Sequence, residues 1–329
     1  MRREGWLDVA RCLACVCVLV IHCPGPECGS GLLHAVVNYY AVSMASVMFF
    51  MISGALVLWR PVDDALPWLR HRLGRVVIPM VIWTVVTLLV NFAMGRLLPA
   101  DLLRRLLLIP VQAQEGAFWF IYVVAGIYLV APVVASWLDS ARQRDVLLYI
   151  GLWFMTLFVP WVAHFVPEAK LITSDGYGYL YHFHGYLGLA VAGYYIRRYG
   201  VPCRMRWLLL ALVALMALPV ALRAAHVPGQ LWTPRLSPNI VAITIVVFAL
   251  LRGTSYHVLR TSYFGLMARY TFGIYLMHKL IIMCVLGPLL WPLHLGYAIE
   301  VPLMVVGTIA IAVPAITLLR RLPCHRLFC

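Results

Sequence analysis

The stretch VVNYYAVSMASVMFFMISGALVL, residues 36–58, contains no charged side chain. About 20 mostly apolar residues are enough for a helix to cross a membrane, so this stretch predicts a transmembrane helix. Similar stretches recur along the chain of 329 residues, of which 64% are hydrophobic and 12% charged, and the mean hydropathy is +0.91. So few charges could not coat a soluble core of this size. The composition therefore excludes a soluble globular enzyme, a disordered chain and a secreted disulfide scaffold.

Ten such stretches predict an all-α, polytopic bundle of about ten transmembrane helices, in which residues 1–329 form a single integral membrane domain. The predicted spans lie near residues 7–23, 36–58, 76–94, 118–138, 146–165, 178–196, 206–222, 237–252, 271–291 and 299–319. Residues 102–111 include Arg104 and Arg105 and are too short to span, so we expect them at the membrane surface. The first span resembles a signal peptide, but Asp8 and Arg11 interrupt it and it lacks the small residues of a cleavage site, which favours a retained helix.

The distribution of basic residues predicts the orientation in the membrane. Lys and Arg number 26 against 12 Asp and Glu, which gives a formal net charge of +14. Eighteen of the 26 lie at the termini or in alternate loops on one side, six lie on the other side, and Arg11 and Lys279 lie within spans. The positive-inside rule then predicts that both termini are cytoplasmic. These charges occupy short breaks between apolar runs rather than a basic stripe with aromatic residues, so the lipid bilayer, and not nucleic acid, is the expected partner.

Three ionisable residues of the first span are candidates for function, because a charge near a helix centre costs roughly 2.5–3.5 kcal/mol and needs a partner or a purpose. Asp8 and Arg11 are three residues apart and can pair on one helix face. Arg11 and His22 are eleven apart, which is three turns plus about 20°, so both point the same way with roughly 16 Å between them along the axis. Either residue alone could simply mark a membrane interface. Together they favour the two ends of a substrate path, with Arg11 suited to phosphate and His22 to general-base catalysis.

Polar residues of two other segments add to these candidates. Arg72 and Arg75, three residues apart before the third span, could hold a phosphate oxyanion or could be ordinary cytoplasmic loop cations. The ninth span contains Tyr275, His278 and Lys279, of which Tyr275 and His278 can share a face.

Carboxylates and histidines near the outer ends of other spans have open roles. Glu115 and Glu300 lie near the outer ends of the fourth and tenth spans, and either could orient His22. His182 and His184, two residues apart, do not share a helix face and are poor joint metal ligands.

The nine cysteines predict neither a disulfide framework nor a metal site. Cys12, Cys15 and Cys17 lie within the first span and act there as small apolar side chains. Cys23 and Cys28 could form a disulfide if their loop is extracytoplasmic.

Short motifs along the chain, taken together and in order, resemble the acyltransferase-3 family of integral membrane acyltransferases. Arg11 and His22 are similar to its Arg-x10-His signature. The other stretches that resemble the family are Phe49-Phe50-Met51-Ile52-Ser53-Gly54, Arg72-x-x-Arg75, Trp119-Phe120 followed by Tyr128 and Pro132, and Gly273-Ile274-Tyr275-Leu276-Met277-His278. The chain looks most like the small bacterial surface-polysaccharide O-acetyltransferases, of the enterobacterial common antigen type. One departure is that the family often has a His shortly before the fourth-span Trp, whereas Ala117 and Phe118 precede Trp119 here.

The resemblance implies transfer of an acyl group, usually acetyl, from cytoplasmic acyl-CoA to an acceptor in the bacterial inner membrane. The expected donor is acetyl-CoA, the expected acceptor is a hydroxyl of a cell-surface glycan or its lipid-linked precursor, and no metal is expected. His22 and Arg11 are then essential, and Arg72 and Arg75 lie near the donor. The remaining candidate supporting residues are Asp8, Ser53, Glu115, Trp119, Tyr275, His278 and Lys279. Direct attack of the hydroxyl on the thioester and a transient acyl-enzyme are the two alternative routes, and direct attack is favoured because no Ser- or Cys-based triad is evident in the sequence.

Two other functions are compatible with polar residues inside spans. A transporter or flippase for a polysaccharide precursor would use them along its pathway, although no matching halves are evident in the sequence. An acyl-relay component would pass acyl groups outward to a separate transferase. Acetyl-CoA binding distinguishes the enzyme from the flippase, and acetylation of a purified acceptor without other proteins distinguishes it from the relay.

Overall fold

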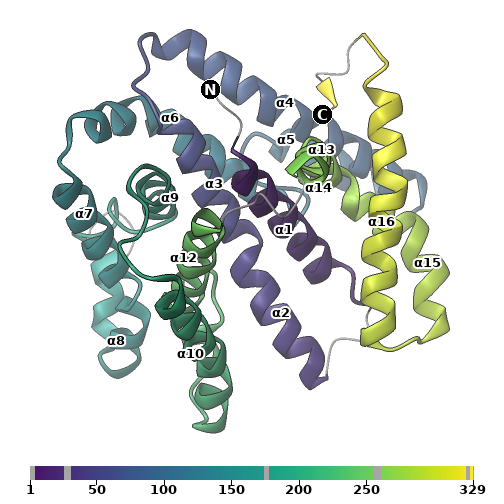
Figure 1. Cartoon of the computed structure of the whole chain (residues 1–329). Coiled ribbons are helices and arrows are strands. Elements are labelled where there is room, and N and C mark those ends of the chain that lie inside the picture. The colour runs from purple at the N-terminus through teal and green to yellow at the C-terminus, as the bar shows by residue number, and fades with distance from the viewer. Residues whose placement is uncertain (1–3, 26–30, 174–177, 255–260, 324–326, 329) are drawn as a thin grey trace. The chain divides into compact units, whose positions relative to one another are not determined.

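The computed structural model describes residues 4–25, 31–173, 178–254, 261–323 and 327–328, and the regular elements in these ranges are helices (Figure 1). The α-helices are α1 (Gly5–His22), α2 (Leu32–Met44), α3 (Ser46–Val57), α4 (Ala65–Ala93), α5 (Pro99–Leu108), α6 (Trp119–Ser140), α7 (Gln143–Thr156), α8 (Val159–Phe165), α9 (Leu187–Tyr199), α10 (Met205–Ala224), α11 (Gly229–Trp232), α12 (Pro238–Gly253), α13 (Thr261–Ala268), α14 (Thr271–Ile281), α15 (Gly287–Leu290) and α16 (Tyr297–Leu319). The other helical segments are the 3-10 helices η2 (Pro167–Thr173) and η4 (Trp291–Leu293) and the π-helix η3 (Ile282–Leu286). The predicted all-α fold is confirmed for the described residues.

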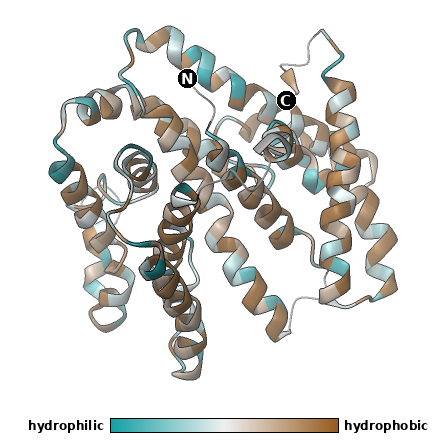
Figure 2. Cartoon of the chain, in the orientation of Figure 1, coloured by the Kyte–Doolittle hydropathy of each residue, from teal (hydrophilic) through white to brown (hydrophobic). Residues whose placement is uncertain are grey.

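Eight helical segments of the described chain are long and apolar enough to cross a membrane, which makes this a multi-pass membrane protein. They are Gly5–His22, Leu32–Val57, Ala65–Ala93, Trp119–Ser140, Gln143–Phe165, Met205–Ala224, Thr271–Leu293 and Tyr297–Leu319. Figure 2 shows hydrophobic residues along most of α10, α12 and α16, with hydrophilic residues gathered on parts of α4 and in the segments that join helices.

The remaining two of the ten predicted spans correspond to shorter helices. The predicted span 237–252 corresponds to α12, with 16 residues, and the predicted span 178–196 overlaps α9, with 13 residues. A helix of 13 residues is about 20 Å long, short of the roughly 30 Å of a bilayer's hydrocarbon core. The expected helix over 178–186 is wrong, because Gly185 has a φ of +116° and α9 begins only after it. A count of ten membrane crossings therefore stays a prediction.

The third predicted span differs in where it begins. α4 starts at Ala65, well before the predicted residue 76, and the Asp64 side chain caps it by accepting a hydrogen bond from the Leu66 N–H at 3.2 Å. Arg72 and Arg75 are consequently helical rather than part of a loop. Residues 102–111 correspond to α5, a ten-residue helix with no buried residue among those described.

The chain folds into two compact units. The first takes residues Met1–Ala14, Tyr39–Pro61 and Ala131–Gly265, and the second takes Cys15–Asn38, Val62–Val130 and Leu266–Cys329. Four helices, α1, α2, α6 and α13, contribute residues to both units.

In the first unit, α3 and α9 are packed backbone to backbone. A Cβ atom on Gly54 of α3 would lie 1.9 Å from the Ala190 carbonyl oxygen of α9, and a Cβ on Gly193 of α9 would lie 2.0 Å from the Met51 carbonyl oxygen of α3. Small residues permit this approach in membrane proteins. Gly54 belongs to the family-like stretch 49–54, so that stretch contributes to a helix contact.

In the second unit, the end of α1 runs parallel to α14. The Cys15 thiol donates to the Thr271 carbonyl oxygen at 3.8 Å, and His22 lies against His278. Both helices advance by seven residues between these two contacts, so they stay in register for about two turns. α14 also packs on α16, where Gly273 faces Ile316 so closely that a Cβ would lie 2.7 Å from the Ile316 side chain.

Candidate active site

The turn that follows α1 is anchored at two points within the second unit. The backbone N–H of Gly25 donates to Glu300 Oε1 at 2.8 Å, and Glu300 is only 2% exposed. Trp291 Nε1 donates to the Cys23 carbonyl oxygen at 3.5 Å. A Cβ atom added to Gly25 would lie only 2.6 Å from the ring of the same Trp291. These contacts hold the chain directly after His22. Of the two carboxylates that could orient His22, Glu300 is the one bonded to its turn.

His22 and His278 form the central contact of the candidate site. Their ring centroids are 5.1 Å apart and the rings are inclined at 37°. His22 is half-buried, whereas His278 is 0% exposed. The sequence separation is 256 residues, so the pairing depends on the parallel arrangement of α1 and α14. A neutral imidazole can take a proton from a substrate at neutral pH.

Tyr275 is fixed one turn before His278. Its hydroxyl donates to the Ala117 carbonyl oxygen, and its ring contacts Phe118 and Phe120 at centroid distances of 6.0 Å. The Tyr275 hydroxyl therefore donates its proton to the backbone of the segment that directly precedes α6. Ala117 and Phe118 stand where the resemblance led us to expect a His, and both are buried against α14 here.

The Glu115 carboxyl group is affected by burial and by two cations, one of which is Lys279 on α14. Burial raises the pKa of the Glu115 carboxyl group above its ordinary value, and the charges of Lys279 and Arg105 oppose this rise. Lys279 occupies the last turn of α14, next to His278. The π-helix η3 follows directly, and π-helical turns occur frequently at functional sites.

The predicted donor-binding arginines lie on α4 in the second unit. The guanidinium of Arg72 lies 5.7 Å from the centroid of the Trp68 ring, and Trp68 contacts Tyr128 of α6 at 6.3 Å. Arg75 is exposed, one turn further along α4. Arg72 is thus held over an aromatic face while Arg75 extends outward. Trp119, at the start of α6, is half-buried and contacts Phe120 at a centroid distance of 6.4 Å.

Arg11 and Asp8 lie in the first unit. Arg11 Nη1 and Asp8 Oδ1 are 3.0 Å apart, which confirms the pairing predicted from their spacing. The Asp8 side chain is 2% exposed and that of Arg11 is 29% exposed. Ser53, on α3 of the same unit, is half-buried.

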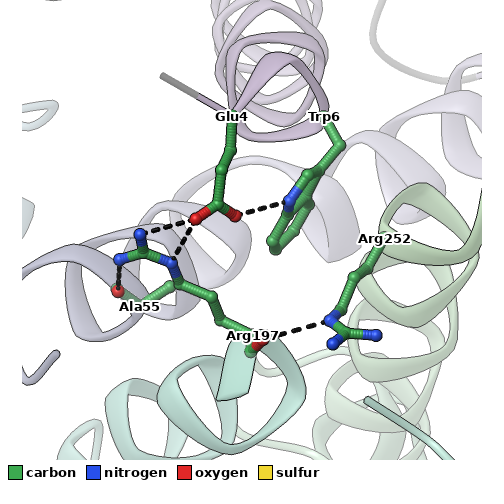
Figure 3. Close-up of polar contacts among 5 residues, drawn as sticks. All are labelled: Glu4, Trp6, Ala55, Arg197 and Arg252. Atoms are coloured by element: carbon green, nitrogen blue, oxygen red, sulfur yellow. Dashed lines mark hydrogen bonds and ion pairs between the residues drawn. The ribbon is translucent and has the colours of Figure 1, made fainter. Parts of the chain in front are cut away.

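A buried arginine cluster in the first unit was missed by the sequence reasoning, which counted Arg197 only as a loop cation. Arg197 lies in the last turn of α9, and its side chain is 3% exposed. Its Nε and Nη2 donate to Glu4 Oε1 at 2.9 and 2.6 Å, and its Nη1 donates to the Ala55 carbonyl oxygen at 2.6 Å (Figure 3). The guanidinium also lies 4.0 Å from the centroid of the Trp59 ring.

The cluster extends to neighbouring elements of the same unit. Trp6 Nε1 donates to the other Glu4 oxygen at 2.8 Å, and Arg252 Nε of α12 donates to the Arg197 carbonyl oxygen at 3.2 Å (Figure 3). The cluster therefore ties the start of α1 to the ends of α3, α9 and α12. The signal that could have revealed it is Glu4, an acidic residue just before the first apolar run.

Burial raises the pKa of the Cys23 thiol to about 12, with the Glu300 carboxylate adding to the effect, so this neighbour of His22 is a poor nucleophile. Cys28 lies outside the described residues, so its pairing with Cys23 stays a prediction. Among the described residues, no group of three or more His, Cys, Asp and Glu side chains could hold a metal ion. His182 and His184 lie in the turns before α9.

A multi-pass helical protein that brings two imidazoles together beside charged side chains has the groups needed for proton transfer to and from a substrate. A family model described as an acyltransferase domain matches residues 4–317, and the chain belongs to this acyltransferase-3 family. The protein is therefore a membrane acyltransferase, which acts between an acyl donor and an acceptor. No curated protein and no solved structure matches the chain.

Proposed function

We propose that the protein transfers an acetyl group from acetyl-CoA to a hydroxyl of a cell-surface glycan or its lipid-linked precursor. The observation that carries this proposal is the half-buried His22 ring in contact with the buried His278, within a chain of the acyltransferase-3 family. The resemblance to small bacterial O-acetyltransferases supports the choice of an acetyl group and a glycan.

His22 acts as the general base in this proposal. It takes the proton of the acceptor hydroxyl as the oxygen attacks the thioester carbonyl carbon. A carbon–oxygen bond forms, the carbon–sulfur bond breaks, and the CoA thiolate leaves with the proton from His22. Direct attack is favoured because no Ser- or Cys-based triad is evident in the sequence, and burial raises the pKa of the Cys23 thiol, which makes it a poor nucleophile.

The donor's phosphates bind at the basic face of α4 in this proposal. Arg72 and Arg75 are three residues apart on one helix, so their guanidiniums can both reach a phosphate oxyanion. The contact of Arg72 with Trp68 restricts its side chain, which lowers the entropy lost on binding. Arg11 is proposed as an essential residue on the strength of the family resemblance.

The proposed location is the bacterial inner membrane, with about ten crossings, both termini in the cytoplasm and the whole chain acting as one acyltransferase domain. The support is the 18-to-6 distribution of basic residues and the family match over residues 4–317.

The proposal is tested with the purified full-length protein and its His22→Ala variant in lipid nanodiscs. Labelled acetyl-CoA is supplied with a glycolipid extract from cells that produce the protein, and label in the glycan fraction is measured. We expect the variant to lose at least about 100-fold in transfer, the scale of a general base's contribution, while it still binds acetyl-CoA. Undiminished transfer by His22→Ala would refute the role of His22.

The donor site is tested with the Arg72→Ala and Arg75→Ala variants. We expect KM for acetyl-CoA to rise about 10-fold in each with little change in kcat, because a phosphate contact acts on binding rather than on chemistry. Arg142→Ala is the matched control, since Arg142 is an exposed arginine of the first unit that pairs with Asp145. An unchanged KM in both α4 variants would place the donor elsewhere.

A further inference from the structure

The two ring nitrogens of His278 are in different situations. Nδ1 lies 2.6 Å from the Tyr275 carbonyl oxygen, and because a carbonyl can only accept, Nδ1 must carry the proton. As a neutral imidazole, His278 then has a bare Nε2 that can only accept. This Nε2 is buried and has no hydrogen-bond partner among the described residues.

A buried acceptor without a partner weakens a fold, so native proteins rarely keep one without a use for it. Two rings pack against His278: His22 at a centroid distance of 5.1 Å and Tyr275 at 5.8 Å. The Tyr275 hydroxyl donates to the Ala117 carbonyl oxygen, which leaves His22 as the side-chain donor for Nε2. Ring nitrogens lie outside the centroids, so a His22 N–H that points at Nε2 across this contact is within hydrogen-bond reach of it. Catalytic hydrogen bonds are often long or misaligned without substrate and tighten only in the reacting complex.

We propose that His278 is a positioning residue whose Nε2 accepts a hydrogen bond from one ring N–H of His22. The other His22 nitrogen then carries the lone pair that takes the proton of the acceptor hydroxyl, as a general base requires. This inference rests on the proposed function, in which His22 is the base. No further proton is needed, because the hydroxyl proton passes to His22 and then to the departing thiolate.

The hydrogen bond contributes more during the reaction than before it. When His22 takes the hydroxyl proton it becomes an imidazolium, and its bond to Nε2 becomes charge-assisted and stronger. Stabilisation that increases in the transition state raises kcat. The Tyr275 carbonyl fixes the His278 ring, as the outer partner of a metal-bound histidine fixes that ring.

A neutral imidazole suits this position in a membrane protein. Many catalytic histidines are oriented by a carboxylate. A carboxylate at the fully buried position of His278 would be a buried charge that costs several kcal/mol to desolvate, whereas the His278 ring supplies an acceptor with no net charge. The His278 contact orients His22 from the α14 side, while Glu300 holds the turn that follows it.

The first experiment does not depend on activity. Full-length protein with 15N-labelled histidine is studied in lipid nanodiscs by NMR, and the His278 signals are identified by their loss in His278→Gln. We expect Nδ1 of His278 to be protonated, and the resonance of its bare Nε2 to lie at lower frequency in the wild type than in His22→Phe, where the donor is absent. The same Nε2 resonance in both proteins would overturn the inference.

The second experiment compares turnover of His278→Phe and His278→Gln. We expect His278→Phe to lower kcat roughly 10- to 100-fold, the contribution of a hydrogen bond to a charged group, with KM for acetyl-CoA within about twofold. His278→Gln retains an acceptor oxygen near the position of Nε2 and should recover most of kcat. Thr308→Val is the control, because it also removes a buried, unpartnered polar atom of the second unit, and its kcat should be unchanged.

The outcomes separate the inference from the proposed function. A folded His278→Gln as slow as His278→Phe would overturn the inference, because the acceptor atom would then not matter. A wild type that shows the Nε2 shift but transfers no acetyl group would overturn the proposed function and uphold the contact between the two histidines.

Discussion

The Gly25 N–H donates to the buried carboxylate of Glu300 at 2.8 Å, three residues after His22. The bond joins the end of α1 to the start of α16, and it restrains the position from which His22 meets a substrate. A hydrogen bond to a charged acceptor contributes about 1.5–3 kcal/mol, so its loss should affect both stability and turnover.

Glu300→Ala should lower the free energy of unfolding by about 1–3 kcal/mol and kcat by roughly 10-fold, because the buried Gly25 N–H loses its acceptor and the turn after His22 loosens. Glu300→Gln keeps a carbonyl oxygen and should lie close to the wild type. Unfolding in denaturing detergent and acetyl-transfer rates measure the two effects. Equal damage in both variants would mean that the charge of Glu300, rather than its bond to Gly25, is what matters.

Glu4→Ala should destabilise the protein by about 3 kcal/mol, because it leaves the guanidinium of Arg197 buried without its carboxylate. The value is at the low end for a buried pair since the Glu4 side chain is 32% exposed. The double variant Glu4→Ala/Arg197→Met should be more stable than Glu4→Ala alone, as it removes the stranded charge.

The matched control for the Glu4–Arg197 pair is Arg142→Ala, which breaks the ion pair with Asp145 at the surface. The two side chains are 68% and 39% exposed, so the change should stay within about 0.5 kcal/mol. The free energy of unfolding is measured for all four proteins. A double variant less stable than Glu4→Ala would show that the contacts of Arg197 with Ala55 and Trp59 outweigh the buried charge.

Gly54→Ala should separate α3 from α9 and cost about 1–3 kcal/mol or more, because its Cβ would overlap the Ala190 carbonyl. Gly151→Ala on α7 is the control, since nothing lies within 4 Å of the added Cβ. That variant should be as stable as the wild type or gain up to about 1 kcal/mol from the higher helix propensity of Ala. The midpoints of thermal unfolding of the two variants and the wild type are compared. A Gly54→Ala protein as stable as the wild type would contradict the close packing of α3 and α9.

Glu115 should make stability depend on pH. Burial raises its pKa above the ordinary 4.5 while Lys279 and Arg105 oppose the rise, so its contribution to stability is fully present below pH 4.5 and is lost as pH rises through the raised value. Glu115→Gln should therefore match the wild type near pH 4 and be more stable at pH 7. Lys279→Met should enlarge the loss of stability at pH 7 in proteins that retain Glu115, because it removes one of the cations that oppose the rise in the pKa of Glu115. Midpoints of thermal unfolding measured between pH 4 and 8 test this prediction. A wild type that is more stable than Glu115→Gln at pH 7 would contradict it.

The sequence predicted those features that depend on local composition. Apolar stretches of sufficient length located most membrane helices, and the three-residue spacing of Asp8 and Arg11 predicted their ion pair. A hydropathy window misses the polar first turns of α4, where a helix continues through Arg72 and Arg75. The hydropathy window also extended the predicted helix backward from α9 through a stretch rich in Tyr, Phe and His, because hydropathy does not register the backbone turn at Gly185.

The features that escaped prediction join residues far apart in the chain. Arg197 and Glu4 are 193 residues apart, and counting charges by loop treated Arg197 as solvated although it is buried. His22 and His278 were both candidates, but their spacing of 256 residues gave no sign that α1 and α14 bring them together. Such contacts follow from helix packing, which a single sequence does not encode in any local pattern.

The matched seven-residue intervals from Cys15 to His22 and from Thr271 to His278 have a consequence for sequence alignments. One inserted or deleted residue in either interval would swing its imidazole by about 100° around the helix axis and separate the two rings. Active relatives should therefore show both intervals as ungapped blocks of equal length, even where the segments around them vary in size.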